Sequence, residues 1–414
     1  MEERGHEAHS CRVVKTGNIT SRPEHEALLC CLQASVNAET EGRLRDLVVA
    51  NFDWKYLFQL ARRHSVVPLT SARLQQYASD LIPTAELQRL KKHYQENTAR
   101  NLILTAELVR IIELLANSGI EAVPYKGPAL ALFAYGDLAL RRYVDLDIMV
   151  RKSDVLQARD LLIADGYRQT RELNLDQQQR LLQTQHNLQF SRSRHQLIVE
   201  LHWEVASHFF ASSVQADELW QNLVSIQLNG TRVQTLAAED LLFSLCVHGS
   251  RHLWERLSWI CDIAMIVERH QLDWPRLLQR AAANHNERMF LLGPHLAARL
   301  MGTQLPDTVV AETKADSRLN PLATEITERL FNGTIHIPAS RREIFKYNFQ
   351  VRQGWGSRAR YGLFMLSPTD SDFSIVSLPQ RLGFVYYLLR PFRLLLKEKA
   401  AGASAPPAYT SEDH

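Results

Sequence analysis

The chain has 414 residues, of which 45% are hydrophobic and 22% are charged. This is an ordinary globular composition, and the length is sufficient for two or three packed units. The formal net charge of +3 does not approach the clustered basicity of a dedicated nucleic-acid-binding protein, although local patches such as Arg341-Arg342 could meet anionic substrates. A DNA partner is therefore not indicated.

The five cysteines form no Cys-x-x-Cys pattern, and no secretion signal precedes them. They are Cys11, Cys30, Cys31, Cys246 and Cys261. We therefore expect reduced thiols in a cytoplasmic protein. Cys246 and Cys261 are expected to be packing residues.

Residues 1–23 are rich in His, Glu and Ser without periodicity, which predicts a disordered leader. Residues 24–118 carry helical periodicity, including 54–64 and a long pattern over 85–115 that stops at Asn117-Ser118-Gly119. This region predicts an N-terminal helical unit. His64, which lies just before Pro68, is expected to help close that unit rather than to take part in chemistry.

Residues 119–236 read as a mixed α/β core that begins with an apolar stretch over 120–125. This stretch leads into Lys126-Gly127-Pro128 and a short helical pattern that ends at Tyr135. Gly127 allows the backbone to approach a ligand closely, and Pro128 suits a helix start whose amides would face an anion. The turn is therefore a candidate phosphate site.

The second apolar stretch of the core, over 144–150, carries two carboxylates. As a strand it sends Val144, Leu146, Ile148 and Val150 to one face and both Asp145 and Asp147 to the other. Their Cα atoms would lie about 6.6 Å apart, which suits carboxylates that hold Mg²⁺ or Mn²⁺ together with substrate phosphates. The same pattern also fits the solvated edge of an ordinary strand.

Arg141 and Arg142 directly precede that strand. A guanidinium at this place could bind phosphate oxygens in a bidentate manner, or hold the carboxylates before a metal arrives. Surface ion pairs are the alternative reading.

A strand over 196–203, QLIVELHW, offers a third carboxylate, Glu200. Alternation places Glu200 and His202 on the face opposite Leu197, Val199, Leu201 and Trp203. A solvated edge strand is the alternative. Further strands are predicted at 187–191, 225–228 and 232–235, with a helix over 153–165.

Residues 237–397 predict a C-terminal helical unit, with helices over 237–301 and from 321 onward. His248 and His252 lie one helical turn apart, but no third ligand with zinc spacing accompanies them, so hydrogen bonds that support the site, or contact with the nucleotide, are expected instead. Trp254 and Trp259 fit core packing better than base stacking.

The end of the chain carries an apolar run and then a polar tail. The run over 384–396 is interrupted by Arg390, Pro391 and Arg393 and is too short to cross a bilayer. Packing between helices explains it more simply than contact with a membrane surface. Residues 398–414 predict a disordered tail.

The order of these parts resembles the DNA polymerase β-like nucleotidyltransferase superfamily, and within it the bacterial uncharacterised nucleotidyltransferase family. The shared parts are Lys-Gly, Arg four residues before an Asp-x-Asp pair, and Glu-x-His-Trp. The resemblance implies an α+β fold in which a small mixed sheet is flanked by N- and C-terminal helical units. It also implies metal ligation by Asp145, Asp147 and Glu200, with His202 supporting Glu200, and binding of the nucleotide by Lys126, Gly127 and Arg141.

The function implied by the resemblance is metal-dependent transfer of a nucleoside monophosphate. The donor would be a nucleoside triphosphate and the acceptor a hydroxyl or phosphate on an unidentified small molecule, sugar, peptide or protein. One alternative is a catalytically silent nucleotide-binding or interaction module. A glycosyltransferase that uses Asp-x-Asp is a weaker alternative, because the hundred residues before the pair read as helical rather than as a nucleotide-binding α/β domain.

Overall fold

The computed structural model describes residues 22–48, 51–170, 182–183, 185–192, 197–205, 216–334, 339–366 and 385. The predicted tail and nearly all of the predicted leader lie outside these residues, as does the apolar run over 384–396 except for residue 385. Within the described residues, no helix combines the length and the apolar character that crossing a membrane requires.

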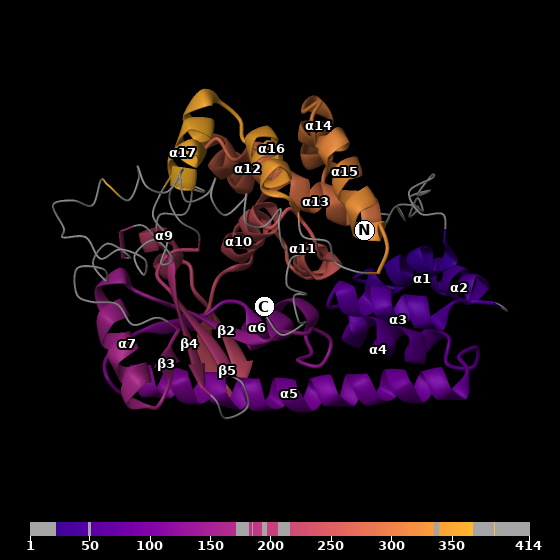
Figure 1. Cartoon of the computed structure of the whole chain (residues 1–414), viewed down its shortest axis with the longest axis horizontal. Coiled ribbons are helices and arrows are strands. Elements are labelled where there is room, and N and C mark those ends of the chain that lie inside the picture. The colour runs from indigo at the N-terminus through magenta and orange to yellow at the C-terminus, as the bar shows by residue number, and fades with distance from the viewer. Residues whose placement is uncertain are drawn as a thin grey trace, which may run out of the picture.

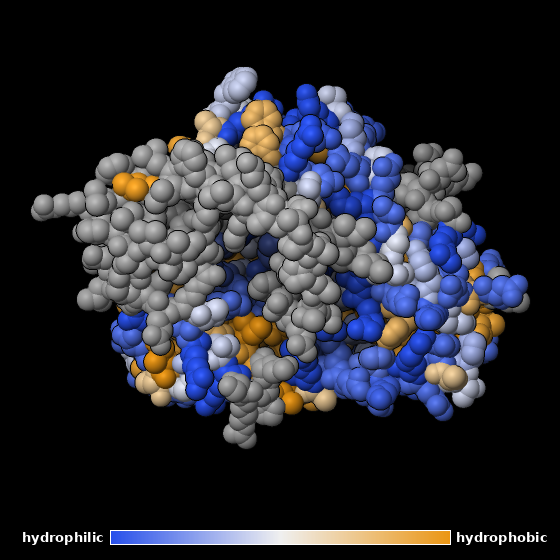
Figure 2. Space-filling model, in the orientation of Figure 1, coloured by the Kyte–Doolittle hydropathy of each residue, from blue (hydrophilic) through white to orange (hydrophobic). Residues whose placement is uncertain are grey.

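Four short helices and one long helix form the N-terminal part. They are α1 (Pro23–Leu32), α2 (Ala38–Leu47), α3 (Trp54–Arg63), α4 (Val67–Tyr77) and α5 (Thr84–Ala116). N-cap side chains explain where two of these helices begin. The side chains of Asn37 and Asp53 accept hydrogen bonds from backbone N–H groups in the first turns of α2 and α3. Figure 1 shows α5 passing beneath both the short helices and the sheet. Hydrophilic residues dominate the outer surface over α1–α5 in Figure 2.

A five-stranded mixed sheet forms the centre, in the order β1-β2-β5-β4-β3. The strands are β1 (Ala122–Pro124), β2 (Asp145–Val150), β3 (Arg168–Gln169), β4 (Asn187–Arg192) and β5 (Leu197–His202). β2 and β5 are parallel, and the other neighbours are antiparallel. The predicted α+β class is confirmed.

Short helices and a separate hairpin complete this central part. The helices are α6 (Gly127–Leu130), the π-helical η1 (Ala131–Tyr135), the 3₁₀ turn η2 (Lys152–Asp154), α7 (Val155–Ala164) and α9 (Ala216–Gln221). The hairpin pairs β6 (Val224–Leu228) with β7 (Thr231–Thr235), so the last two predicted strands form their own two-stranded sheet.

Among the described residues, eight helices form the C-terminal part. They are α10 (Ala238–Arg251), α11 (Leu257–Arg269), α12 (Trp274–Ala283), α13 (Glu287–Met301), α14 (Asp307–Ala315), α15 (Leu319–Phe331), α16 (Arg341–Val351) and α17 (Trp355–Leu366). The pattern did not predict α14. Cys246 and Cys261 are fully buried free thiols in the core, as expected, and Cys11 lies outside the described residues.

Two apolar cores hold the sheet. Leu146, Ile148 and Val199 pack on one face with residues of α5 and α7. On the other face, Met149 and Val123 join a core shared with α10, α11 and α13. The strand face that bears Asp147 is therefore covered by the C-terminal helices rather than open to bulk water.

Candidate active site

The turn after β1 brings the backbone close to β2. Gly127 has φ +54°, and a Cβ added there would lie 3.1 Å from the carbonyl oxygen of Asp145. A side chain at this position would therefore press on the strand as well as strain the turn. α6 begins at Gly127 and continues without a break into η1, as the short helical pattern predicted.

Three carboxylates lie on one face of the two parallel strands. Asp147 of β2 pairs in register with Glu200 of β5, and Asp145 lies two residues before Asp147 on the same face. The exposed fraction of the Asp147 side chain is 3% and that of Glu200 is 19%. The convergence of these three residues, which are up to 55 positions apart, agrees with the arrangement expected from sequence.

Lys126 and His202 contact these carboxylates directly. The Nζ atom of Lys126 donates a hydrogen bond to Oδ1 of Asp147 at 3.0 Å. The Nε2 atom of His202 lies 3.2 Å from Oδ1 of Asp147 and 3.2 Å from Oε2 of Glu200, although neither approach has hydrogen-bond geometry. Glu200 also accepts a hydrogen bond from the side-chain amide of Asn187 at 2.9 Å.

Burial and the neighbouring charges shift the pKa values of the residues in this cluster in different directions. Burial, together with the negative charges of Asp147 and Glu200, raises the pKa of Asp145 to about 7. Burial also disfavours ionised Asp147, but Lys126 and His202 outweigh it and hold the Asp147 pKa well below its usual range. Burial would lower the pKa of His202, yet the two adjacent carboxylates raise it. At neutral pH, one further positive charge would be favourable near Asp145.

Asp147, Glu200 and His202 also form a candidate metal-ligand group. One ligand atom from each residue lies within 4.8 Å of the other two. The ligand set expected from sequence contained Asp145 in place of His202. In the structure Asp145 shares the face but lies outside this compact group, so His202 is the additional candidate ligand.

Arg141 contacts a carboxylate that sequence reasoning did not single out as its partner. Its Nε donates to Oδ1 of Asp262 at 2.8 Å, and its Nη2 donates to Oδ2 at 3.0 Å. The hydroxyl of Tyr135 donates to the same carboxylate at 2.7 Å, and Asp262 is fully buried. The guanidinium thus joins the segment before β2 to α11, while Arg142 remains exposed.

The histidines and tryptophans of the C-terminal part divide into two kinds. Trp254 is fully buried, and its ring lies so close to Gly249 and Gly293 that a Cβ at either position would collide with it. Trp259 is only partly buried, and its ring contacts those of His248 and His252. The prediction of core packing is confirmed for Trp254, and Trp259 packs against the same core while staying partly exposed. No metal-ligand group within the described residues includes either histidine.

His64 has the structural position that its sequence context suggested. It is fully buried, and its Nε2 lies 3.0 Å from the carbonyl oxygen of Leu330. Its Nδ1 accepts a hydrogen bond from the backbone of Leu257 at 3.4 Å. His64 therefore connects α3 to two C-terminal helices and lies outside the carboxylate cluster.

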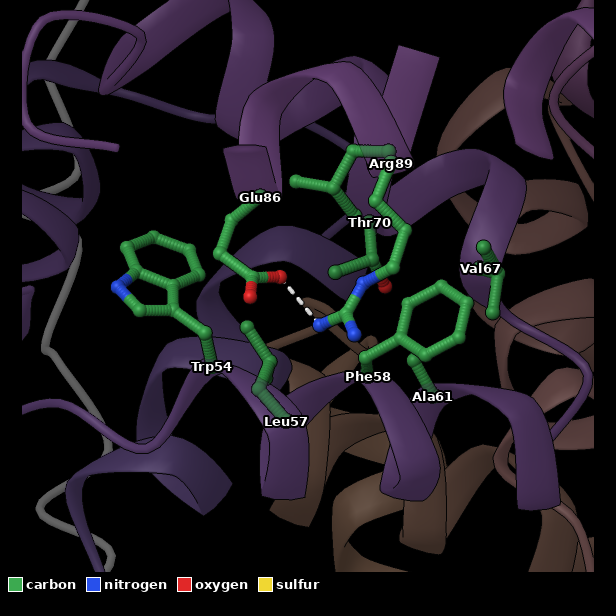
Figure 3. Close-up of a pocket in the computed structure, with 9 residues that line it drawn as sticks. Trp54, Leu57, Phe58, Ala61, Val67, Thr70, Glu86 and Arg89 are labelled. Atoms are coloured by element: carbon green, nitrogen blue, oxygen red, sulfur yellow. Dashed lines mark hydrogen bonds and ion pairs between the residues drawn. The ribbon is translucent and has the colours of Figure 1, made fainter. Parts of the chain in front are cut away.

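A small pocket elsewhere does not belong to this site. Figure 3 shows it among α3, α4 and α5, where mainly apolar side chains and the Glu86–Arg89 ion pair line it. It contains no residue of the carboxylate cluster. Its lining suits water or helix packing better than a triphosphate.

Comparison with known proteins identifies the family of this chain. A sequence profile of the uncharacterised nucleotidyltransferase family matches residues 50–302. No curated protein gives a significant match. One similar solved structure is that of an antigenic nucleotidyltransferase-like protein from Paracoccidioides brasiliensis, at 16% identity, a TM-score of 0.31, and coverage of 50% of this chain and 96% of that one. That likeness is too weak to carry an argument. The profile match spans more than half of the chain, which therefore belongs to the uncharacterised nucleotidyltransferase family.

Proposed function

We propose that this protein is a metal-dependent nucleotidyltransferase that moves a nucleoside monophosphate from a nucleoside triphosphate to a hydroxyl or phosphate of an acceptor. The observation that carries the proposal is the pairing of Asp147 with Glu200, beside Asp145 and next to the Lys126-Gly127 turn. Oxygen ligands gathered beside a turn that admits a phosphate suit a triphosphate bound with a divalent cation.

The donor set fits such a cation. Three carboxylates share a largely buried face, where burial, together with the charges of Asp147 and Glu200, raises the pKa of Asp145 to about 7. Asp145, Asp147 and Glu200 would hold Mg²⁺ or Mn²⁺, and His202 offers a nitrogen beside them. When bound, the ion would neutralise triphosphate charge and polarise the acceptor oxygen.

The remaining groups act on the triphosphate. Lys126, whose pKa the charge of Asp147 holds above its usual range despite burial, carries a positive charge in the site at neutral pH. The Gly127 turn permits close approach of the backbone to phosphate oxygens. The acceptor oxygen bonds to the α-phosphorus as the bond from that phosphorus to pyrophosphate breaks, and the acceptor proton passes to solvent.

In this proposal Arg141 has a positioning role. Its guanidinium is bound to Asp262, so it would orient the segment that leads into the Asp-x-Asp strand while adding positive charge near the phosphates. Direct binding of the nucleotide by Arg141 would use the guanidinium N–H groups that do not contact Asp262, including those of Nη1.

A catalytically silent nucleotide-binding module is the second candidate. The observation that favours it is the ion pair between Lys126 and Asp147, because the lysine ammonium already neutralises the carboxylate that a metal would need. In this candidate the nucleotide binds without turnover. A glycosyltransferase gains no support from the strand order or from the helical N-terminal part.

Calorimetric titration with ATP and Mn²⁺, run beside a pyrophosphate-release assay, separates the two candidates. Binding with pyrophosphate release that Asp147→Asn abolishes supports the enzyme. Binding without release, in the presence of cell extract as a source of acceptors, supports the silent module. A mass-spectrometric screen of the four nucleoside triphosphates for an added nucleotidyl mass would then identify the acceptor.

A further inference from the structure

Three aromatic rings gather where α10 turns into α11, and we call His248, His252 and Trp259 the aromatic shelf. The centroids of His248 and His252 lie 4.7 Å apart. The Trp259 centroid lies 5.2 Å from His248, edge to face, and 5.4 Å from His252. Trp259 and His248 are partly buried, and His252 is exposed, so the shelf reaches the surface of the protein.

The shelf is held rigidly by the turn that joins its two helices. Leu253 and Trp254 both adopt left-handed backbone conformations, with φ +56° and +54°. The Trp254 amide donates to the carbonyl oxygen of Gly249 at 2.9 Å, and the Trp254 ring fills the gap between Gly249 and Gly293. Non-glycine residues adopt this conformation at a cost that surrounding packing must offset. The turn therefore fixes the rings before any ligand arrives.

The shelf lies next to the proposed phosphate site. Trp259 precedes Asp262 by one turn of α11, and Asp262 binds Arg141 just ahead of the Asp-x-Asp strand. α11 packs on η1, which continues from the Lys126-Gly127 turn (Figure 1). The positive charges of Lys126 and Arg141 are close enough to His248 to add to the effect of burial in lowering its pKa. At neutral pH His248 is thus an uncharged aromatic ring.

We propose that the aromatic shelf binds the base of the nucleoside triphosphate, with Trp259 as the stacking surface. This inference rests on the proposed function, because it takes the triphosphate to lie at the carboxylates and the Lys126 turn. A partly exposed indole beside an anion site suits a ligand that is planar at one end and anionic at the other.

The test compares two ligands that share a triphosphate but differ in the base. Binding of ATP and of inorganic tripolyphosphate, each with Mg²⁺, is measured by calorimetry on the full chain. Trp259→Ala is expected to weaken ATP binding about tenfold and to leave tripolyphosphate binding within about twofold. Trp259→Phe should keep most of the ATP affinity, since it retains an aromatic face. Trp355→Ala is the matched control, because that ring is 79% exposed and lies on α17.

The outcomes separate this inference from the function on which it rests. A loss confined to ATP that phenylalanine restores supports base stacking. Equal losses for both ligands, or no loss, overturn the shelf as a base site and leave the proposed function in place. If the wild-type protein binds neither ligand, both proposals are wrong.

Discussion

Two clusters of charged side chains flank the same sheet, and they are built on opposite principles. In one, Glu107 of α5 and Asp165 after α7 are bound by Arg110 and Arg192, so two negative charges meet two positive ones. The hydroxyl of Tyr167 also donates to Glu107. In the other cluster, Asp145, Asp147 and Glu200 crowd around Lys126 and His202.

The consequence appears in the pKa values. Burial would raise the pKa of Glu107, but its arginine and tyrosine partners lower it instead. For Asp145, burial and neighbouring carboxylates act together and raise the pKa to about 7. Basic partners thus neutralise the carboxylates of the first cluster and stabilise the fold. In the second cluster the carboxylates have too little positive charge around them. Carboxyl groups with such perturbed pKa values are typical of functional sites.

Asp147→Asn is expected to have the largest effect. It removes the carboxylate that lies at the centre of the site, so nucleotidyl transfer should fall at least about 1,000-fold. The measurement is pyrophosphate release per folded protein, with Asp165→Asn from the balanced cluster as the control. Activity of Asp147→Asn within tenfold of wild type would remove the carboxylates from the mechanism.

Arg141→Lys should lower activity by roughly tenfold, because a lysine cannot reproduce the bidentate contact with Asp262. If Arg141 only positions the strand, kcat falls while tripolyphosphate affinity is kept. If it binds phosphate directly, tripolyphosphate affinity falls as well. Steady-state kinetics and calorimetry on one preparation distinguish these two roles.

Asp165→Asn should affect stability instead. It leaves Arg110 with one acidic partner fewer, at a cost of about 1 kcal/mol after allowance for solvent screening at this partly exposed position. The expected fall in Tm is about 1–2 °C, with activity per folded molecule unchanged. A large loss of activity at full stability would show that the two clusters are coupled.

Metal-free protein should show a pair of opposite pH dependences. Glu107, whose pKa is lowered in the fold, adds stability above its ordinary pKa and loses it as pH falls, so the cost of Glu107→Gln should shrink in acid. Asp145 keeps its proton in the fold up to about pH 7, so its ionisation costs stability as pH rises from about 4 to 7. Asp145→Asn should therefore become increasingly stabilising over that range, as chemical denaturation in EDTA would measure.

The sequence predicted those parts of the site that follow from local alternation. The period of two over 144–150 and 196–203 located β2 and β5 and placed Asp145, Asp147 and Glu200 on one face, as the strand register confirms. The alternation of apolar and polar residues does not predict which strands pair with each other. The resemblance to a family implied that Glu200 joins the Asp-x-Asp pair, but the parallel pairing of β2 with β5 was not predicted.

The pattern of residues in the sequence could not predict contacts between segments that are far apart in the chain. Arg141 and Asp262 are 121 positions apart, and nothing in the spacing of either residue names the other. Trp254 and Trp259 likewise share a helical context, and only the left-handed turn sends one ring into the core and leaves the other partly exposed. The helix α14 was missed because its few buried residues, Val309 and Thr313, give a weak apolar stripe.

The continuous α5 limits how this molecule can move. It packs against α4 at one part of its length and against β1, β2, α6 and α7 at another, and its 33 residues extend about 50 Å. Because no glycine or internal proline interrupts it, bending between its two packing regions would break backbone hydrogen bonds. The N-terminal bundle and the sheet should therefore travel as one body.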